Sequence, residues 1–191
     1  TWKALTGRYI WAGGNFSLTN NAFADSTTFD TFGRTESKTV NVDGNATAVV
    51  YSGAGIPMFN RKINLEPGIN ASFFRFTNYV GGTENKTDNY AITPAMKVKF
   101  NLLGDSLEME VSGSYGYNSA ISSLNSVATP YSVGNYAAGF RWRLPKGFTI
   151  SSEGTYTVNA QLGEAGGNGI YDTQFFVLNA EISKTFLKTN N

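Results

Sequence analysis

The chain of 191 residues contains no cysteine and no histidine. The absence of cysteine excludes a disulfide scaffold, and the absence of both excludes a Cys/His zinc site. Without histidine, a Ser-His-Asp triad and a histidine general base are also excluded. Charge is scarce too, because only 15% of the residues are charged, against about 25% in an average soluble domain. The formal net charge of +1 offers no electrostatic footprint for nucleic acid, so we expect no nucleic-acid partner.

The chain has no long hydrophobic run either. No apolar stretch approaches the about 18 residues that a membrane helix requires. The mean hydropathy of −0.23 would normally indicate a soluble protein. Mean hydropathy does not identify membrane β-barrels, because their lipid-facing and lumen-facing side chains alternate and the average over the chain stays modest. No signal peptide is visible at Thr1, so we expect a mature chain or a fragment.

Aromatic residues and a two-residue periodicity are abundant. Aromatics make up 14% of the chain, and apolar and polar residues alternate over most of it, whereas no helical period is sustained. We therefore predict about eight strands of about 12–16 residues, longer than the usual about 5–6. In the first run, Arg8–Thr19, the alternation of apolar and polar residues is irregular, which predicts a β-bulge near Gly13 and Gly14. The other runs begin at Val40, Ile63, Tyr90, Leu107, Tyr136, Phe148 and Phe176.

The connections between these runs alternate in length. Short turns at one end and long polar loops at the other are typical of bacterial outer-membrane barrels. The short turns are Pro57–Lys62, Gly104–Ser106 and Pro145–Gly147, and the long loops are Asn21–Glu36, Gly81–Asn89, Ile121–Ser132 and Leu162–Thr173. The sequence therefore predicts an all-β fold: an antiparallel transmembrane β-barrel segment.

Aromatic side chains gather near the strand ends on the apolar side of the alternation. They would form the girdles found at membrane interfaces. In this interpretation Phe100, Trp142 and Leu178 contact lipid. A soluble β-sandwich, such as a lectin-like binding module, also alternates, but its strands are shorter. The aromatics in question are Tyr90, Tyr115, Tyr117, Tyr136, Trp142, Phe148, Tyr156, Phe176 and Phe186.

Charged side chains on the polar side of the alternation are the candidate functional residues. A two-residue turn at Gly104–Asp105 places Lys99 opposite Glu110. A three-residue turn at Pro145–Gly147 places Arg141 opposite Ser151 and diagonal to Glu153. Facing lipid, each charge would cost a few kcal/mol, so we expect the set inside a lumen. We call this set the charge ladder: Lys97, Lys99, Glu108, Glu110, Arg141, Arg143, Glu153 and Glu181.

The charge ladder has two interpretations. It is either a structural device that fixes strand register or a docking surface for a plug domain. Glu108 and Glu110 do not resemble a glycosidase pair, since they point the same way from one strand. We expect no catalytic residue, no metal site and no cofactor, and therefore no enzyme. Weak candidates for a loop-bound cation are Asp25, Asp30, Glu164 and Asp172.

Several short stretches carry a family resemblance. From about Lys38 to Phe186, the chain resembles the outer-membrane β-barrel family that includes TonB-dependent receptor barrels. The stretches are Thr39–Asn45, Asn64–Gly68, Tyr90–Pro94, Leu144–Phe148 and Leu178–Lys184. The resemblance implies a Gram-negative outer-membrane transporter that takes up a scarce solute past a plug. It implies as partners membrane lipid, the remaining barrel strands and plug of the same protein, a periplasmic energy-coupling protein and a surface lipoprotein.

Two parts of the family pattern are missing. No plug-like α/β pattern precedes the strands, and no closing strand with a terminal aromatic ends the chain at Asn191. We therefore expect residues 1–191 to form a single barrel segment without a separate plug domain. The alternative is a complete eight-stranded barrel with a structural or adhesion role. Many small inward-facing residues favour a wide lumen instead, namely Gly68, Ser72, Ala95, Ser112, Ser114, Gly116, Ala137 and Gly139.

Overall fold

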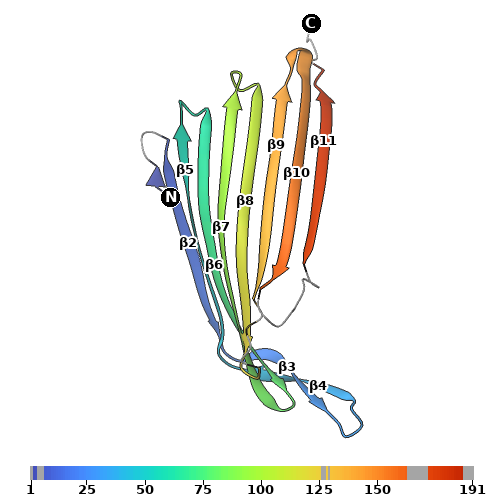
Figure 1. Ribbon diagram of the computed structural model, residues 1–191. Coiled ribbons are helices and arrows are strands. Elements are labelled where there is room, and N and C mark those ends of the chain that lie inside the picture. Colours follow the sequence, from blue (N-terminus) through green and yellow to red (C-terminus); the bar gives the residue numbers. More distant parts are fainter. Residues whose placement is uncertain (1, 4–6, 126–127, 129, 163–171, 187–191) are drawn as a thin grey trace.

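The computed structural model describes residues 2–3, 7–125, 128, 130–162 and 172–186. These residues form an all-β structure, an 11-stranded and almost wholly antiparallel sheet (Figure 1). Nine strands follow the order β1-β2-β5-β6-β7-β8-β9-β10-β11, while β3 and β4 pair with each other off this path and β3 also pairs in parallel with β6. The strands are β1 (Trp2–Lys3), β2 (Tyr9–Thr19), β3 (Ala22–Phe29), β4 (Thr35–Val42), β5 (Asn45–Met58), β6 (Ile63–Val80), β7 (Thr83–Leu102), β8 (Leu107–Ser122), β9 (Tyr131–Arg143), β10 (Phe148–Gln161) and β11 (Thr173–Lys184). In these ranges no helix is long and apolar enough to cross a membrane.

The prediction of about eight long strands is confirmed by β2 and by β5 to β11, which have between 11 and 20 residues each. Consecutive strands from β5 onwards pair with each other as antiparallel neighbours. Short turns join β5 to β6, β7 to β8 and β9 to β10 at one end of the sheet (Figure 1). The β3–β4 hairpin lies at the other end, where β8 ends and β9 begins (Figure 1).

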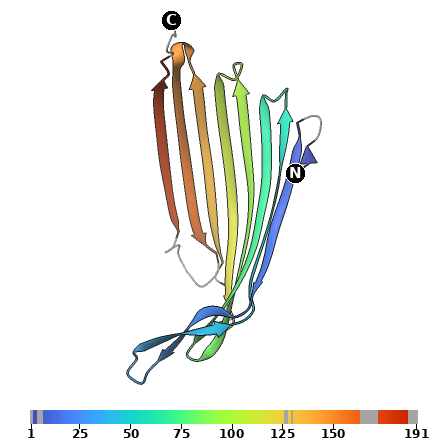
Figure 2. The same ribbon diagram turned by 180° about the vertical axis from the view of Figure 1, so that it is seen from behind.

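The first predicted loop is wrong, because Asn21–Glu36 contains β3 and the start of β4. The predicted strand across Val40–Val50 is also wrong, since it is broken between β4 and β5. The pairing register runs through the break, with Thr19 opposite Asn45 and then Ala22 opposite Val42. The strands therefore form one long hairpin that bends between β2 and β3, and Figure 2 shows its outer half lying across the end of the sheet.

Side-chain oxygens hold this bend. The Asn21 backbone N–H donates to Asp43 Oδ1 over 2.7 Å, and the Gly44 N–H donates to Asn20 Oδ1 over 3.3 Å. Gly44 has a φ of +81°, a left-handed conformation that costs glycine little. The bend therefore arises from Asx bonds that cross the hairpin, and these leave no trace in the hydrophobic period.

The predicted loop Gly81–Asn89 is wrong as well. Strands β6 and β7 continue to Val80 and Thr83, and only Gly81 and Gly82 join them. Both glycines have positive φ, +60° and +77°, which matches the type I′ turn of a two-residue hairpin. The bulge predicted at Gly13 and Gly14 is absent too, since the β2–β5 register passes through both without a break.

Over the described residues, the sheet has no second layer and is not closed. Among the described hydrophobic residues, only Val42 (4% exposed) and Ala46 (8%) are buried. In the described ranges β11 pairs with β10 alone, and β2 pairs with β5 and β1. A β-sandwich would bury the facing sides of two packed sheets, so the sandwich alternative does not describe this structure.

Candidate functional site: the polar face of the sheet

The pairing register sorts the side chains into two faces. Residues aligned across antiparallel strands point to the same side of the sheet, and successive residues point to opposite sides. On one side, which we call the apolar face, large hydrophobic side chains lie in rows and are 37% to 74% exposed. They are Ile10, Phe16, Leu18, Val50, Met58, Ile69, Tyr90, Ile92, Met96, Leu102, Met109, Val111, Tyr115, Tyr117, Tyr136, Phe140, Trp142, Phe148, Tyr156, Phe176, Leu178 and Ile182.

Every strand aromatic predicted for a girdle lies on the apolar face, and Trp142 and Leu178 are 41% and 64% exposed there. Charged side chains of the long strands reach this face only near the strand ends of the described part. At one end Arg75 forms a bidentate pair with Asp88, with both N–O distances 2.6 Å. The Arg75 guanidinium also lies 5.7 Å from the Phe73 ring, which is 5.1 Å from the Tyr90 ring.

The opposite side, which we call the polar face, carries the charge ladder. The predicted registers are confirmed, since Lys99 lies opposite Glu110 and Arg141 opposite Ser151. The same pairings put all the small residues predicted to face inward on this side. Strand alternation thus separates an apolar surface from a surface of charges, amides and small residues.

The ion pairs of the ladder are diagonal rather than directly across. The Lys97 ammonium lies 2.9 Å from Glu110, that of Lys99 lies 3.1 Å from Glu66, and the Arg143 guanidinium lies 2.7 Å from Glu108. The Lys and Glu side chains of these pairs are 24% to 42% exposed. Pairs this open are worth about 0.2–1 kcal/mol each, so they add little to the stability of the sheet.

Glu66 is an ion-pair partner of the charge ladder that sequence reasoning missed. It accepts hydrogen bonds from the Lys99 ammonium and from the Asn64 amide, the latter over 2.7 Å. It lies in the alternating run from Ile63, and its position two residues after Asn64 placed it on the polar side. Strand β6, which carries Glu66, pairs with β7 through the turn at Gly81 and Gly82. The length of that turn would have predicted that Glu66 pairs with a lysine of β7.

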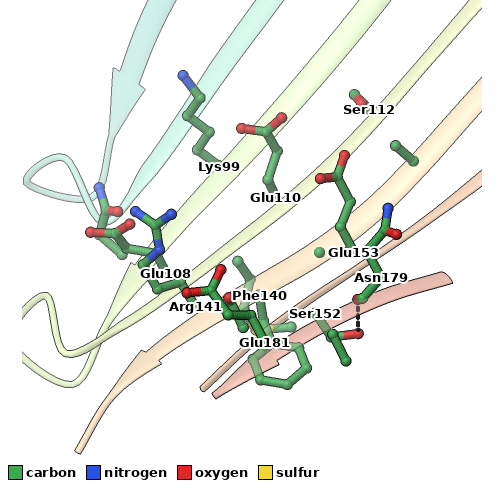
Figure 3. A pocket seen from close by; sticks show the side chains of 16 residues that line it. Lys99, Glu108, Glu110, Ser112, Phe140, Arg141, Ser152, Glu153, Asn179 and Glu181 are labelled. Carbon is green, nitrogen blue, oxygen red and sulfur yellow. Dashed lines mark hydrogen bonds between the residues drawn. The ribbon is translucent and has the colours of Figure 1, made fainter. Parts of the chain in front are cut away.

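Three ladder residues have no ion pair within the described part of the chain. Arg141, Glu153 and Glu181 project from β9, β10 and β11 into a hollow of about 810 Å³ on the polar face. Figure 3 shows the Glu110 and Glu153 carboxylates on the same side of the sheet, and the Phe140 ring on the other. Arg141 lies diagonal to Glu153, as predicted, but the two side chains form no ion pair. Within the described part of the chain, these three charged groups thus line the hollow without an ion-pair partner.

Asp30 and Asp172, two of the four candidate cation ligands, accept hydrogen bonds within the protein. Asp30 accepts the backbone N–H groups of Phe32 and Arg34, and its second oxygen is 2.6 Å from Arg34 Nε. The Arg34 N–H and then its guanidinium hold the pKa of Asp30 below the ordinary value of 3.8. Asp25 lies on β3, Asp172 accepts the Gln161 N–H, and Glu164 lies outside the described residues. Within the described ranges, no cluster of three acidic residues could hold a metal ion.

Comparison of the chain with protein-family models, with curated proteins and with solved structures gave no match. The fold of the described residues defines the class of protein: an open, all-β antiparallel sheet with one apolar and one polar face.

Proposed function

We propose that this sheet is part of the wall of a bacterial outer-membrane β-barrel, in a transporter that resembles the TonB-dependent receptors. The apolar face would contact lipid, and the polar face would line a water-filled or plugged lumen. The observation that carries the proposal is the exposure of large apolar side chains over one whole face, because soluble monomers rarely expose such a surface.

The height of the apolar face fits a membrane. On β7 this face runs from Leu102 to Tyr90, twelve residues apart, before Asp88 appears on it. At a rise of about 3.3 Å per residue and a tilt of about 45°, that run is about 28 Å tall. The apolar band of outer-membrane barrels is about 25 Å tall and is flanked by aromatic girdles. The Phe73–Tyr90 contact beside the Arg75–Asp88 pair is therefore expected at the membrane boundary.

The edges of the sheet support a larger assembly. The outer edge of β11 has 12 residues and pairs with no described strand. Inside a bilayer each unpaired backbone group costs several kcal/mol, since no water can replace the missing partner. We therefore propose that further strands pair with both edges and close the barrel. The small residues of the polar face suit the wider lumen of such a barrel.

The transport role rests on the family resemblance together with the polar face. The free Arg141, Glu153 and Glu181 would meet a plug domain that fills the lumen. The paired members Lys97, Lys99, Glu108 and Glu110 would hold the strands in register behind it. In this function the sheet supplies wall and docking surface and performs no bond chemistry.

Two neighbouring alanines on β9 allow a matched test. Ala137 shares the polar face with Ser112, and Ala138 shares the apolar face with Val111. Each is changed to cysteine in the full-length protein, with any cysteine outside this sequence replaced, and labelled with an environment-sensitive fluorophore. In vesicles containing brominated lipid, we expect quenching at Ala138→Cys and little at Ala137→Cys. Equal quenching at both positions, or none at Ala138→Cys, would overturn the membrane assignment.

A further inference from the structure

Three aromatic side chains form a group on the polar face, on the first two long strands of the sheet. Tyr9 and Trp11 of β2 and Tyr51 of β5 all point to this side, because Gly55, Gly53 and Gly13 are their respective register partners. The Trp11 and Tyr51 rings are 5.8 Å apart between centroids and tilted by 47°. We call this group the aromatic platform. The platform also explains why the alternation in the first run is irregular, since the apolar residues of β2 lie on both faces of the sheet.

Each ring of the platform lies over a glycine of the neighbouring strand. A Cβ at Gly53 would overlap Trp11 Cζ2, one at Gly13 would lie 2.5 Å from the Tyr51 hydroxyl oxygen, and one at Gly55 would overlap Tyr9 Cε1. Glycine is therefore required for the rings to lie flat against the backbone. One side of each ring packs on the sheet, and the other stays open, so that Trp11 and Tyr51 are 36% and 43% exposed.

The platform forms one wall of a second hollow of about 620 Å³. The Asn70 amide of β6 and the Thr93 hydroxyl of β7 line the same hollow and follow the platform along one register row. Beside this hollow, the backbone pairing between neighbouring strands is interrupted at two prolines. Pro67 and Pro94 lack the N–H that a central strand needs for its hydrogen bonds. Polar groups of side chain and backbone thus surround a flat aromatic surface.

The hollow carries no free charge among its described lining residues. Its two charged members are Lys97, which is paired with Glu110, and Glu66, which is paired with Lys99. The neighbouring hollow differs, because there Arg141, Glu153 and Glu181 have no ion-pair partner. The aromatic platform therefore suits a neutral ligand, and the charge ladder does not.

We propose that the aromatic platform is a binding site for a neutral saccharide. A sugar ring combines C–H faces, which pack on the electron-rich face of an aromatic ring, with a rim of hydroxyl groups. The rings of Trp11 and Tyr51 would take the C–H faces, and Asn70 and Thr93 would bond the hydroxyls. The volume lies within the range of about 300–1,000 Å³ typical of small-molecule sites. The proposal rests on the proposed function in one respect, namely that the polar face lines an accessible lumen.

Saccharide binding can be measured on the full-length protein in detergent with α-linked and β-linked glucose pentasaccharides as probes. We expect saturation-transfer NMR to detect at least one of the two pentasaccharides with a Kd of about 1 mM or tighter. Trp11→Leu should weaken binding at least tenfold, and Trp11→Phe should retain part of it. The control is Phe175→Leu, an exposed aromatic on the polar face of β11 that does not line this hollow, and it should bind as the parent does.

A second measurement uses the unaltered protein, so that a folding defect in Trp11→Leu cannot obscure the result. Oxidation of Trp11 by N-bromosuccinimide, followed by peptide mass spectrometry, should slow at least threefold when the bound pentasaccharide is present. Failure of both probes to bind, or binding that leaves the oxidation of Trp11 unchanged, would overturn the saccharide site. The lipid-quenching experiment at Ala137 and Ala138 is independent of this result, so the two proposals fail separately.

Discussion

The Lys97 ammonium lies 2.9 Å from the Glu110 carboxylate, although the strand register places Lys99, not Lys97, directly opposite Glu110. Lys99 turns instead toward Glu66 on the other neighbouring strand. The two lysines of β7 thus connect β6, β7 and β8 by diagonal pairs. A slip of one strand by two residues keeps every side chain on its own face, so the two-residue period does not prevent it. Such a slip would break these ion pairs, and each pair therefore opposes it.

Reversing one charge of this pair should disturb assembly. In Lys97→Glu, the new carboxylate lies beside Glu110, so the ion pair worth about 0.2–1 kcal/mol is lost and repulsion replaces it. The double variant Lys97→Glu/Glu110→Lys should recover most of the loss. Lys38→Glu on β4, whose side chain is 72% exposed, is the control and should have little effect. The readout is the fraction of full-length protein with heat-modifiable mobility, and equal losses in both single variants would contradict the register role.

Arginine scanning should separate the faces at two adjacent alanines. Ala138→Arg puts a cation on the apolar face, where it would cost about 2–4 kcal/mol near the middle of a bilayer. Ala137→Arg puts it on the polar face, close to Glu110 and Glu153, and should cost much less. The free energy of unfolding in lipid vesicles measures the difference. Costs that are equal, or larger for Ala137→Arg, would show that the polar face is the lipid-facing one.

Glycine replacement should reveal the aromatic platform. Gly53→Ala forces a methyl group into the space of the Trp11 ring and should cost about 1–3 kcal/mol through overpacking. Gly68→Ala is the matched control, because its Cβ would meet only Ser52 O, at 3.5 Å. Thermal unfolding and near-UV circular dichroism of both variants test this. A Gly53→Ala protein with unchanged stability and spectrum would mean that the Trp11 ring does not lie flat on the sheet.

The β3–β4 turn should depend on acid. Because hydrogen bonds from Arg34 lower the folded pKa of Asp30, the turn is stabilised at pH values above the ordinary 3.8. That stabilisation is lost as the pH falls through the lower folded pKa. Hydrogen exchange at the Phe32 and Arg34 amides, corrected for intrinsic rates, should therefore accelerate at acidic pH. Asp30→Asn should exchange rapidly already at neutral pH, and protection that is the same in both proteins would contradict the assignment.

The all-β fold could be predicted because a two-residue period assigns each side chain to a face. Once a turn length is known, the period also sets the register. The turns predicted at Gly104–Asp105 and Pro145–Gly147 therefore placed Lys99 opposite Glu110 and Arg141 opposite Ser151, as the structure has them. The turn at Gly81 and Gly82 has a recognisable sequence signal, a pair of glycines between two alternating runs. The prediction of a long loop there was wrong because the residues on both sides of the glycines are polar. Those residues are polar because β6 and β7 extend past the apolar part of the face.

Other features depend on contacts between segments that lie apart in the chain, so only the tertiary structure decided them. The bend of the first hairpin requires Asn20 and Asn21 to meet Asp43 and Gly44 across two strands. The aromatic platform requires each ring to meet a glycine about 40 residues away, and the choice of diagonal ion pairs follows from sheet twist and side-chain reach. Local periodicity determined which residues share a face of this protein. Which neighbours on that face meet was decided by the curvature and bending of the sheet, because these are properties of all the strands together.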